Sequence, residues 1–278
     1  MIVNKCIIQK SCKNCHSLFD IYIPRLVESK VFCSLSCSQD WWKIKRNKTG
    51  ISFSNPKKFG IFSRKNLNLN EDQTQLLLGS LLGDGYIRER INKSITSYNY
   101  SEGHSIKQID YLIHKMNSLK GFISQKNPTH IKPNGYSKIP KVSMTSIVHN
   151  DFKILSDLFY KKHKGIRIKT ITIKLLNMIK PLALLYWYLD DGDYSKKKTI
   201  KLSTYSFSKK EHIIIKKWFK DNFDINSIIS SINRNEKNMF YIRMNRIDSD
   251  KFISLITPFK HIIPESMHYK IPSIKSVK

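Results

Sequence analysis

The sequence predicts an α+β protein built from two similar halves and preceded by a small cysteine-containing unit. Two observations lead to this prediction. After residue 70 the order helix, strands, helix, strands, helix occurs twice, and all five cysteines lie within the first 37 residues. The repeat indicates halves related by an approximate two-fold axis. We expect a zinc-finger-like unit at 1–42, a basic linker at 43–70, the first half at 71–165 and the second half at 166–278.

The charge balance indicates the kind of partner. The 278 residues include 49 Lys+Arg and 21 Asp+Glu, which gives a net charge of +28 at pH 7. Such an excess repels itself, and a polyanion, most commonly nucleic acid, relieves the repulsion. A chain that is merely lysine-rich is the alternative. No apolar run approaches the roughly 18 residues that a membrane helix needs, so no membrane partner is expected.

The cysteines near the start form two closely spaced pairs, Cys-Lys-Asn-Cys and Cys-Ser-Leu-Ser-Cys, separated by 17 residues. Four thiolates at this spacing can enclose Zn²⁺ in a tetrahedron, and so small a unit needs the metal to hold its shape. His16 or Cys6 could replace one ligand, and a set of reduced, buried cysteines is the alternative. The expected ligands are Cys12, Cys15, Cys33 and Cys37.

The basic stretch at 43–70 lacks periodicity, which predicts a linker, and its charge suits contact with a phosphate backbone. A solvated tether is the alternative.

The next element is a helix that begins after Asn70, contains Gly79 and Gly83, and ends at an Asp-Gly pair. Glycines four residues apart leave a helix face on which another backbone can approach closely.

A second helix begins at Lys180-Pro181 and also ends at Asp-Gly. If the two helices pack together at the two-fold axis, Asp84 and Asp191 converge, and their carboxylates repel unless a divalent cation lies beside them. Mg²⁺ suits such oxygen ligands. A single Asp-Gly would be explained as a helix cap, but two at equivalent positions favour a metal site.

The remaining elements follow the same order in both halves. Polar and aromatic segments of strand character precede amphipathic helices in each case. The expected strands are 94–100, 141–146, 199–205 and 239–244, and the expected helices are 110–120, 150–160, 208–222 and 248–256.

The two Asp-Gly helices resemble the signature helices of a known family. Leu-Leu-Gly-Ser-Leu-Leu-Gly-Asp-Gly-Tyr-Ile at 77–87 and Leu-Leu-Tyr-Trp-Tyr-Leu-Asp-Asp-Gly at 184–192 are similar to the paired motifs of single-chain LAGLIDADG homing endonucleases of the mitochondrial, omega-intron type. The segments 203–208 and 262–272 match that type as well. The resemblance extends from Glu71 to about Ser273, and the cysteine unit lies outside it.

The resemblance implies a saddle of two αββαββα halves whose curved sheets lie along the major groove of a long, asymmetric DNA site. Asp84 and Asp191 would hold Mg²⁺ or Mn²⁺, and each centre would cut one strand by metal-assisted hydrolysis. Lys270 matches the basic residue of the second centre. For the first centre we choose Lys169, with Arg167 as the alternative.

Two residues depart from the family motif. Tyr186 and Asp190 stand where small residues are usual, so we expect the second helix to pack less closely or with a shift. Asp190 directly precedes the expected metal ligand, but Asp191 is the residue that aligns with Asp84.

Basic, polar and aromatic residues alternate along the expected strands, which would place them on one sheet face for contact with phosphates and base edges. The candidates for DNA binding are Arg88, Arg90, Asn92, Lys93, Tyr98, Tyr100, Lys198, Lys201, Arg234, Lys237, Tyr241 and Arg243.

These features favour a site-specific, Mg²⁺-dependent double-strand DNA endonuclease that promotes intron mobility. The alternative is an RNA-binding maturase that assists splicing of its own intron, and a third interpretation is a regulator that binds DNA without cutting. We expect a monomer bound to double-stranded DNA, with intron RNA as a further partner. The Ile-, Lys- and Asn-rich composition indicates an AT-rich genome, and the resemblance to the omega-intron type then implies a mitochondrion-encoded protein, with a chloroplast or phage origin open.

Overall fold

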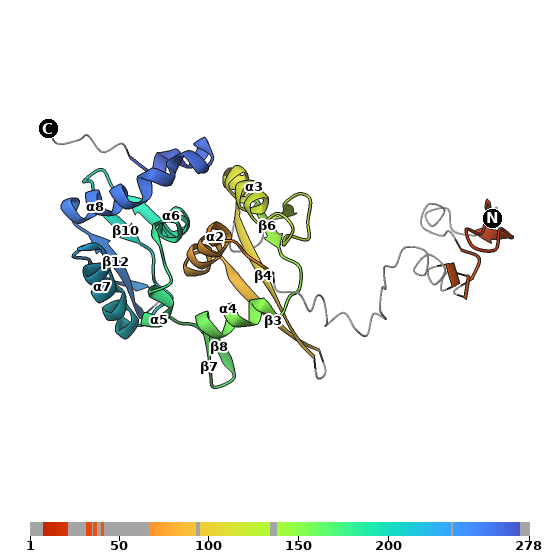
Figure 1. The fold of residues 1–278 in the computed structure, drawn as a ribbon, viewed down its shortest axis with the longest axis horizontal. Coiled ribbons are helices and arrows are strands. Elements are labelled where there is room, and N and C mark those ends of the chain that lie inside the picture. Colours follow the sequence, from red (N-terminus) through yellow and green to blue (C-terminus); the bar gives the residue numbers. More distant parts are fainter. Residues whose placement is uncertain are drawn as a thin grey trace. The chain divides into compact units, whose positions relative to one another are not determined.

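The protein forms two compact units, Met1–Phe59 and Gly60–Lys278 (Figure 1). The computed structural model describes residues 8–21, 32–34, 36–37, 40–41, 67–92, 95–133, 138–234 and 236–272. We consider each unit by itself.

The small unit contains a hairpin and part of a helix. Strand β1 (Ile8–Ser11) pairs antiparallel with β2 (Leu18–Ile21). The turn between them is closed by a hydrogen bond of 2.9 Å from the His16 N–H to the Cys12 carbonyl. Residues 36, 37, 40 and 41 are helical, as expected for the segment after Ser34, and the Trp41 ring lies 5.7 Å from that of Phe32.

The first half of the large unit has the order αββαββα. Its four strands form one antiparallel sheet in the order β3-β4-β6-β5. Its elements are α2 (Glu71–Leu82), β3 (Tyr86–Asn92), β4 (Ile95–Ser105), α3 (Ile109–Ser118), β5 (Thr129–Ile131), β6 (Lys141–Thr145) and α4 (Asp151–Phe159).

The second half repeats this order, and its sheet, β9-β10-β12-β11, repeats the strand order of the first. The predicted α+β fold with two αββαββα halves is therefore confirmed. The elements are α6 (Pro181–Asp191), β9 (Gly192–Tyr194), β10 (Ile200–Leu202), α7 (Lys209–Phe223), β11 (Ile228–Arg234), β12 (Lys237–Met244) and α8 (Arg246–Ile256), followed by the 3₁₀ helices η4 (Thr257–Ile262) and η5 (Glu265–Lys270).

Helices α2 and α6 lie side by side between the two sheets (Figure 1). A capping box starts α2: the Asn70 side chain accepts from the Gln73 N–H, and the Gln73 side chain accepts from the Asn70 N–H. Pro181 occupies the first turn of α6, where its missing N–H costs nothing. Both helices are apolar nearly all round because each also packs against its own sheet.

The two helices approach each other closely at Gly79. A Cβ atom added there would lie 2.3 Å from the Ala183 carbonyl oxygen and 2.9 Å from the Cβ atom of Tyr186. Of the two expectations for Tyr186 and Asp190, looser packing is not seen at this contact, because the glycines of α2 leave room for the larger side chains of α6.

A basic hairpin connects the halves. Strands β7 (Tyr160–His163) and β8 (Ile166–Lys169) pair across the division expected after residue 165, and the short helix α5 (Ile173–Leu176) follows. Arg167 donates to the Ile87 carbonyl and to Ser156 Oγ, so the hairpin packs against the first half. At the other end of that half, buried Leu67 donates its N–H to Asp151 Oδ2 at 2.7 Å, so the last residues of the expected linker pack with the large unit.

None of the helices within the described ranges is long and apolar enough to cross a membrane.

The helix contact predicts that Gly79→Ala destabilises the protein. Alanine favours a helix by about 1 kcal/mol over glycine, but the collision with the Ala183 backbone cannot be relieved by turning a side chain. We expect a net loss of about 2 kcal/mol, within the range for overpacked cores, and a lower midpoint of thermal unfolding. Gly103→Ala is the matched control, since its added Cβ would meet nothing nearer than 3.4 Å. Equal midpoints for the two variants would contradict the close packing.

Candidate active site and nucleic-acid interface

The C-terminal ends of α2 and α6 meet at one corner of the large unit. Asp84 lies just beyond α2, in a turn where the Gly85 N–H donates to the Ser80 carbonyl at 2.7 Å, and Asp191 is the last residue of α6. The Asp84 N–H lies 3.3 Å from Asp190 Oδ2, which links the two helix ends directly. The structure thus brings the two Asp-Gly corners together, as the sequence predicts.

The carboxyl groups at this corner lie in surroundings that disfavour their charged form. Burial, reinforced by the charges of Asp84 and Asp190, raises the pKa of Asp191 to about 8, although Lys169 and Lys270 oppose the shift. Burial also raises the pKa of Asp84, whose side chain is still 44% exposed. Carboxylate groups in this state gain from a divalent cation, and their oxygens suit Mg²⁺ or Mn²⁺. The donor set therefore fits the expected metal.

Two lysines lie beside the carboxylates. Lys169 donates to the carbonyls of Gly83 and Gly85 at 3.1 and 3.0 Å, on either side of Asp84. Lys270 donates to the Leu189 carbonyl at 2.6 Å, two residues before Asp191. Burial lowers the pKa of both lysines, and the nearby aspartates oppose that change.

Arg167, the alternative to Lys169, makes its contacts elsewhere in the first half. Its guanidinium stacks on the Tyr160 ring, 3.8 Å from the centroid, and bonds within the first half. Of the two candidates for the first centre, Lys169 is therefore the one that lies beside Asp84.

A buried ionic network beside Asp84 is the main feature that the sequence did not predict. Lys115, from α3, donates to Asp190 Oδ1 and Oδ2 at 2.8 and 3.1 Å and also to Glu102. Tyr111 donates to Asp190 Oδ1 at 2.9 Å. His104 Nε2 lies 2.8 Å from Glu102 Oε1, and its Nδ1 lies 3.5 Å from Asp84 Oδ2.

The pKa shifts in this network follow from burial and from one lysine shared by two carboxylates. Burial alone would raise the pKa of Glu102, but Lys115 and His104 lower it to about 2. Burial raises the pKa of Asp190 to about 6, since Lys115 only partly offsets that cost and Glu102 adds to it. A sequence signal for the network existed: Lys115 is four residues after Tyr111 and three after Leu112, on the apolar face of α3.

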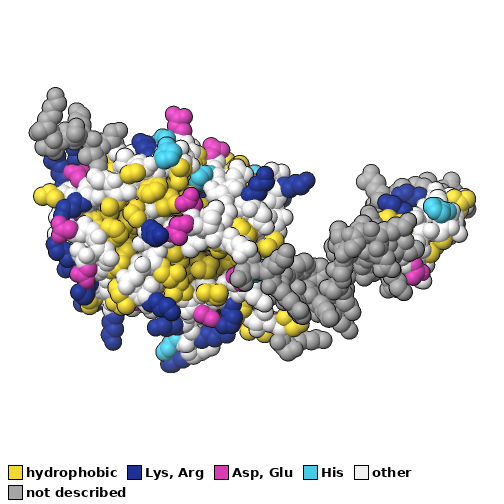
Figure 2. Space-filling model, viewed as in Figure 1, with side chains coloured by type: hydrophobic (Ala, Val, Ile, Leu, Met, Phe, Trp, Pro, Cys, Tyr) yellow, Lys and Arg dark blue, Asp and Glu magenta, His cyan; other side chains and the backbone are white. Residues whose placement is uncertain are grey.

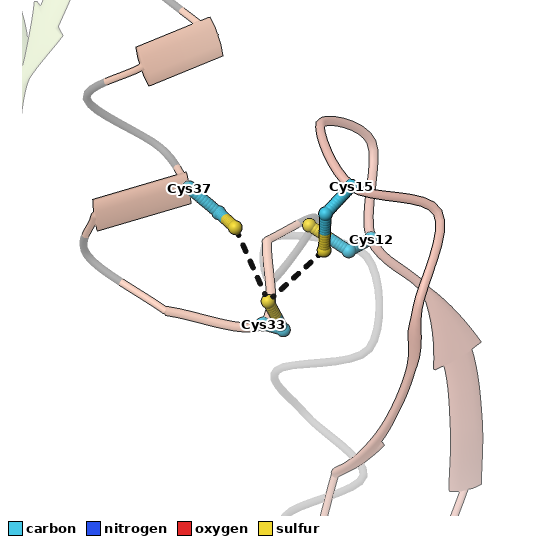
Figure 3. A group of neighbouring side chains, drawn as sticks. All are labelled: Cys12, Cys15, Cys33 and Cys37. Carbon is cyan, nitrogen blue, oxygen red and sulfur yellow. Dashed lines mark hydrogen bonds between the residues drawn. The ribbon is translucent and has the colours of Figure 1, made fainter.

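The second candidate site is the cysteine cluster of the small unit. The four sulfur atoms lie within 4.8 Å of one another, and all four cysteines are free thiols. Cys12 and Cys15 come from the β1–β2 turn, Cys33 from the segment before the helical residues and Cys37 from the helical residues themselves, and they point toward a common centre (Figure 3). The distances from Cys33 Sγ to the sulfur atoms of Cys15 and Cys37 are 3.6 and 3.5 Å. The pairs predicted from spacing therefore meet in space, whereas His16 is not in the group and Cys6 lies outside the described residues.

The thiols interact strongly with each other. Burial raises the pKa of Cys12, but hydrogen bonds from the backbone of Cys15, Cys33 and Asn14 outweigh it and lower the value to about 6. The neighbouring sulfur atoms of Cys37, Cys15 and Cys12 raise the pKa of Cys33 to about 12. A bound cation would remove this mutual repulsion, so the cluster has the chemistry of a Zn²⁺ site.

The second sheet has one face covered by helices and one open face. Ile200, Leu202, Ile242 and Met244 are buried on the covered face. The pairs Lys201–Arg243, Ser230–Tyr241 and Arg234–Lys237 alternate with these residues and share the open face. The Lys201 ammonium lies 4.9 Å from the Tyr241 ring centroid. Five of the candidates for DNA binding thus share one surface, and Lys198 lies exposed in the turn before β10.

The first sheet separates the remaining candidates. Arg88, Arg90 and Asn92 lie on its open face, opposite Asn99, Ser97 and Ile95. The DNA-binding assignments of Tyr98 and Tyr100 are wrong, because both rings lie on the helix-covered face, 8% and 0% exposed. Lys93 falls outside the described residues. In the view of Figure 2, further Lys and Arg side chains lie around the edge of the large unit, with apolar side chains in the middle.

The architecture is that of a pseudo-symmetric two-half protein with paired carboxylates at its central helix pair. Residues 74–252 match the LAGLIDADG DNA endonuclease family, and the chain belongs to that family. It is 25% identical over 215 residues to the DNA endonuclease I-ChuI of Chlamydomonas applanata, covering 74% of this chain and 96% of that protein. Over 265 residues it is 26% identical to the cytochrome b mRNA maturase bI2 of Saccharomyces cerevisiae, covering 91% of this chain and 59% of that protein.

A solved structure supports the fold independently. The homing endonuclease I-WcaI bound to its DNA recognition sequence superposes with a TM-score of 0.63 at 24% identity, over 83% of this chain and 99% of that one.

The raised pKa of Asp191 makes stability depend on pH. A carboxyl group whose pKa rises from about 4 in the unfolded chain to about 8 in the folded chain contributes most stability at low pH, and this is lost as pH rises through 8. Without metal, Asp191→Asn should therefore unfold at a higher temperature than the native chain, by a margin that grows between about pH 5 and about pH 8.5. Added Mg²⁺ should reduce the margin. Asp193→Asn, at an exposed position, is the control, and a margin independent of pH would contradict the buried charge.

Proposed function

We propose that the protein is a site-specific homing endonuclease that cuts both strands of a long DNA site and so promotes the mobility of its intron. The observation that carries this proposal is the pairing of Asp84 and Asp191 where α2 and α6 meet, with Lys169 and Lys270 beside them. Two equivalent centres on one chain match the two strands of a duplex, so one copy of the protein suffices.

The residues of each centre have distinct tasks. Asp84 and Asp191 would hold divalent cations, which supply Lewis-acid activation of water and stabilisation of the leaving 3′ oxygen. Lys169, bonded to the carbonyls on either side of Asp84, and Lys270, bonded to the Leu189 carbonyl, would orient water and screen the charge that develops on phosphate.

The open sheet faces supply the binding surface. Arg88 and Arg90 on the first sheet and Lys201 and Arg243 on the second are placed to contact phosphates or guanine edges, and Asn92 is suited to adenine.

The small unit would hold Zn²⁺ through its four cysteines and add contacts to DNA beyond the two sheets. Lys13, in the knuckle between the first two cysteines, lies 5.1 Å from the Trp41 ring centroid and is exposed. A metal-stabilised knuckle with an outward lysine suits a contact with the phosphate backbone.

An RNA-binding maturase is the second candidate, because the similarity to a maturase extends over most of the chain. The presence of both motif aspartates favours the nuclease, since a pure maturase does not need them. A splicing assay of the host intron with and without the protein separates the two activities. The similarity to a maturase of cytochrome b mRNA, together with relatives named as intron-encoded, also supports a mitochondrial origin.

The nuclease assignment predicts a double-strand cut in DNA that carries the intronless junction of the host gene, in the presence of Mg²⁺. Asp84→Asn should abolish that cut, since the first centre loses its exposed metal ligand. Gel separation of linear products checks the result, and Asp157→Asn on the surface of α4 is the matched control. Undiminished cutting by Asp84→Asn would overturn the assignment.

The cysteine cluster predicts about one zinc ion per chain in the purified protein. Cys12→Ser should lower the zinc content and the stability of the small unit, because three thiolates hold the metal more weakly. Cys6→Ser is the control and should leave the zinc in place. Metal analysis and protease resistance measure the two effects, and zinc loss on Cys6→Ser alone would show that the ligand set is different.

A further inference from the structure

Asp190 belongs to the second half by sequence but is held by the first half. Its carboxylate is fully buried. It accepts from Lys115 and Tyr111, both on α3, and from the backbone N–H of Asp84. Asp190 belongs to α6 of the second half, but these hydrogen-bond donors all come from the first half. Asp190 thus fixes the backbone of the first catalytic aspartate from across the two-fold axis.

The same network reaches the side chain of Asp84. Glu102 accepts hydrogen bonds from the Lys115 ammonium and from the Tyr100 hydroxyl. A third hydrogen bond, of 2.8 Å, joins Glu102 to His104. The other nitrogen of the His104 ring lies 3.5 Å from Asp84 Oδ2. Asp84 is therefore held at two points, through its N–H by Asp190 and through its carboxylate by His104.

The second centre has no counterpart among the described residues. Gly83 occupies the position in α2 that corresponds to Asp190 in α6. Leu202, paired with Gly192, takes the place of Glu102, and Thr204 takes that of His104. Leu202 is a buried apolar residue, and Thr204 is hydrogen-bonded to His212 at 2.8 Å.

The difference is built into the packing of the helix pair. A Cβ atom at Gly83 would lie 2.5 Å from Asp190 Cβ and 2.8 Å from its Oδ2. The absence of a side chain at Gly83 therefore leaves the space that the Asp190 side chain fills. Only one of two equivalent sites can hold a carboxylate in this arrangement.

We infer that Asp190 and Lys115 are positioning residues of the first centre only, so that the two strands of the DNA are cut by centres of unequal construction. The inference rests on the proposed nuclease function. Weakening the network should displace Asp84 and slow the cutting of one strand, while Asp191, Lys270 and the open sheet faces keep their geometry. The variant protein then becomes a strand-biased nickase.

The test is single-turnover cutting by Asp190→Asn of a duplex labelled on both strands, with Mg²⁺. Asparagine keeps the shape of Asp190 but weakens its bonds to Lys115 and to the Asp84 N–H. We expect one strand to be cut about 10- to 100-fold more slowly, the range for a small misplacement of catalytic groups, with the other strand and the affinity for DNA nearly unchanged. Thr204→Val is the matched control, because Thr204 occupies the place in the second half that His104 occupies in the first. It should leave the ratio of the two strand-cutting rates as it is in the native chain.

A second variant covers the case in which Asp190→Asn fails to fold. The triple change Lys115→Met, Glu102→Gln and Asp190→Asn removes the whole buried charge set without leaving one ion unpaired, which proteins often tolerate. It should show the same bias toward cutting one strand. Equal slowing of both strands, or no slowing, in a folded variant overturns the inference. Failure of the native chain to cut either strand refutes the proposed function instead.

Discussion

The close contact between α2 and α6 is the constraint on which the rest of the structure depends. With Gly79 against the Ala183 backbone and Gly83 against Asp190, the helix axes can approach far enough for their C-terminal corners to meet. That meeting brings the acidic side chains of Asp84 and Asp191 close to the half-buried Lys169 and Lys270. The sheets, which extend from the helix pair on either side, then present their open faces from positions that the same contact fixes.

Close packing at the axis also explains why charge is buried there. Carboxylates removed from water are unfavourable unless they are paired, and the first half meets that need with Lys115, Tyr111 and His104. Asp191 has less complete compensation, as its raised pKa shows. A bound divalent cation would relieve the cost of placing carboxyl groups in this position.

Local sequence signals predicted much of the fold. The capping residues, the first-turn proline and the Asp-Gly ends located α2 and α6 closely, and spacing alone identified the cysteine cluster. Features that depend on long-range partners were missed. The face of Tyr98 and Tyr100 depends on the register of β4 with β3, which alternation cannot supply. The packing of the Tyr160–Lys169 hairpin against Ile87 and the bond from Lys115 to Asp190 depend on contacts with residues tens of positions away.

Crystals of the protein with its DNA target and Mn²⁺ give the most direct test of the central claim, through the anomalous scattering of manganese. The account predicts manganese within coordination distance, about 2.0–2.2 Å, of carboxylate oxygens of both Asp84 and Asp191, next to the phosphates to be cut. Manganese bound away from these two aspartates, or DNA seated on the helix-covered sides of the sheets, would contradict it.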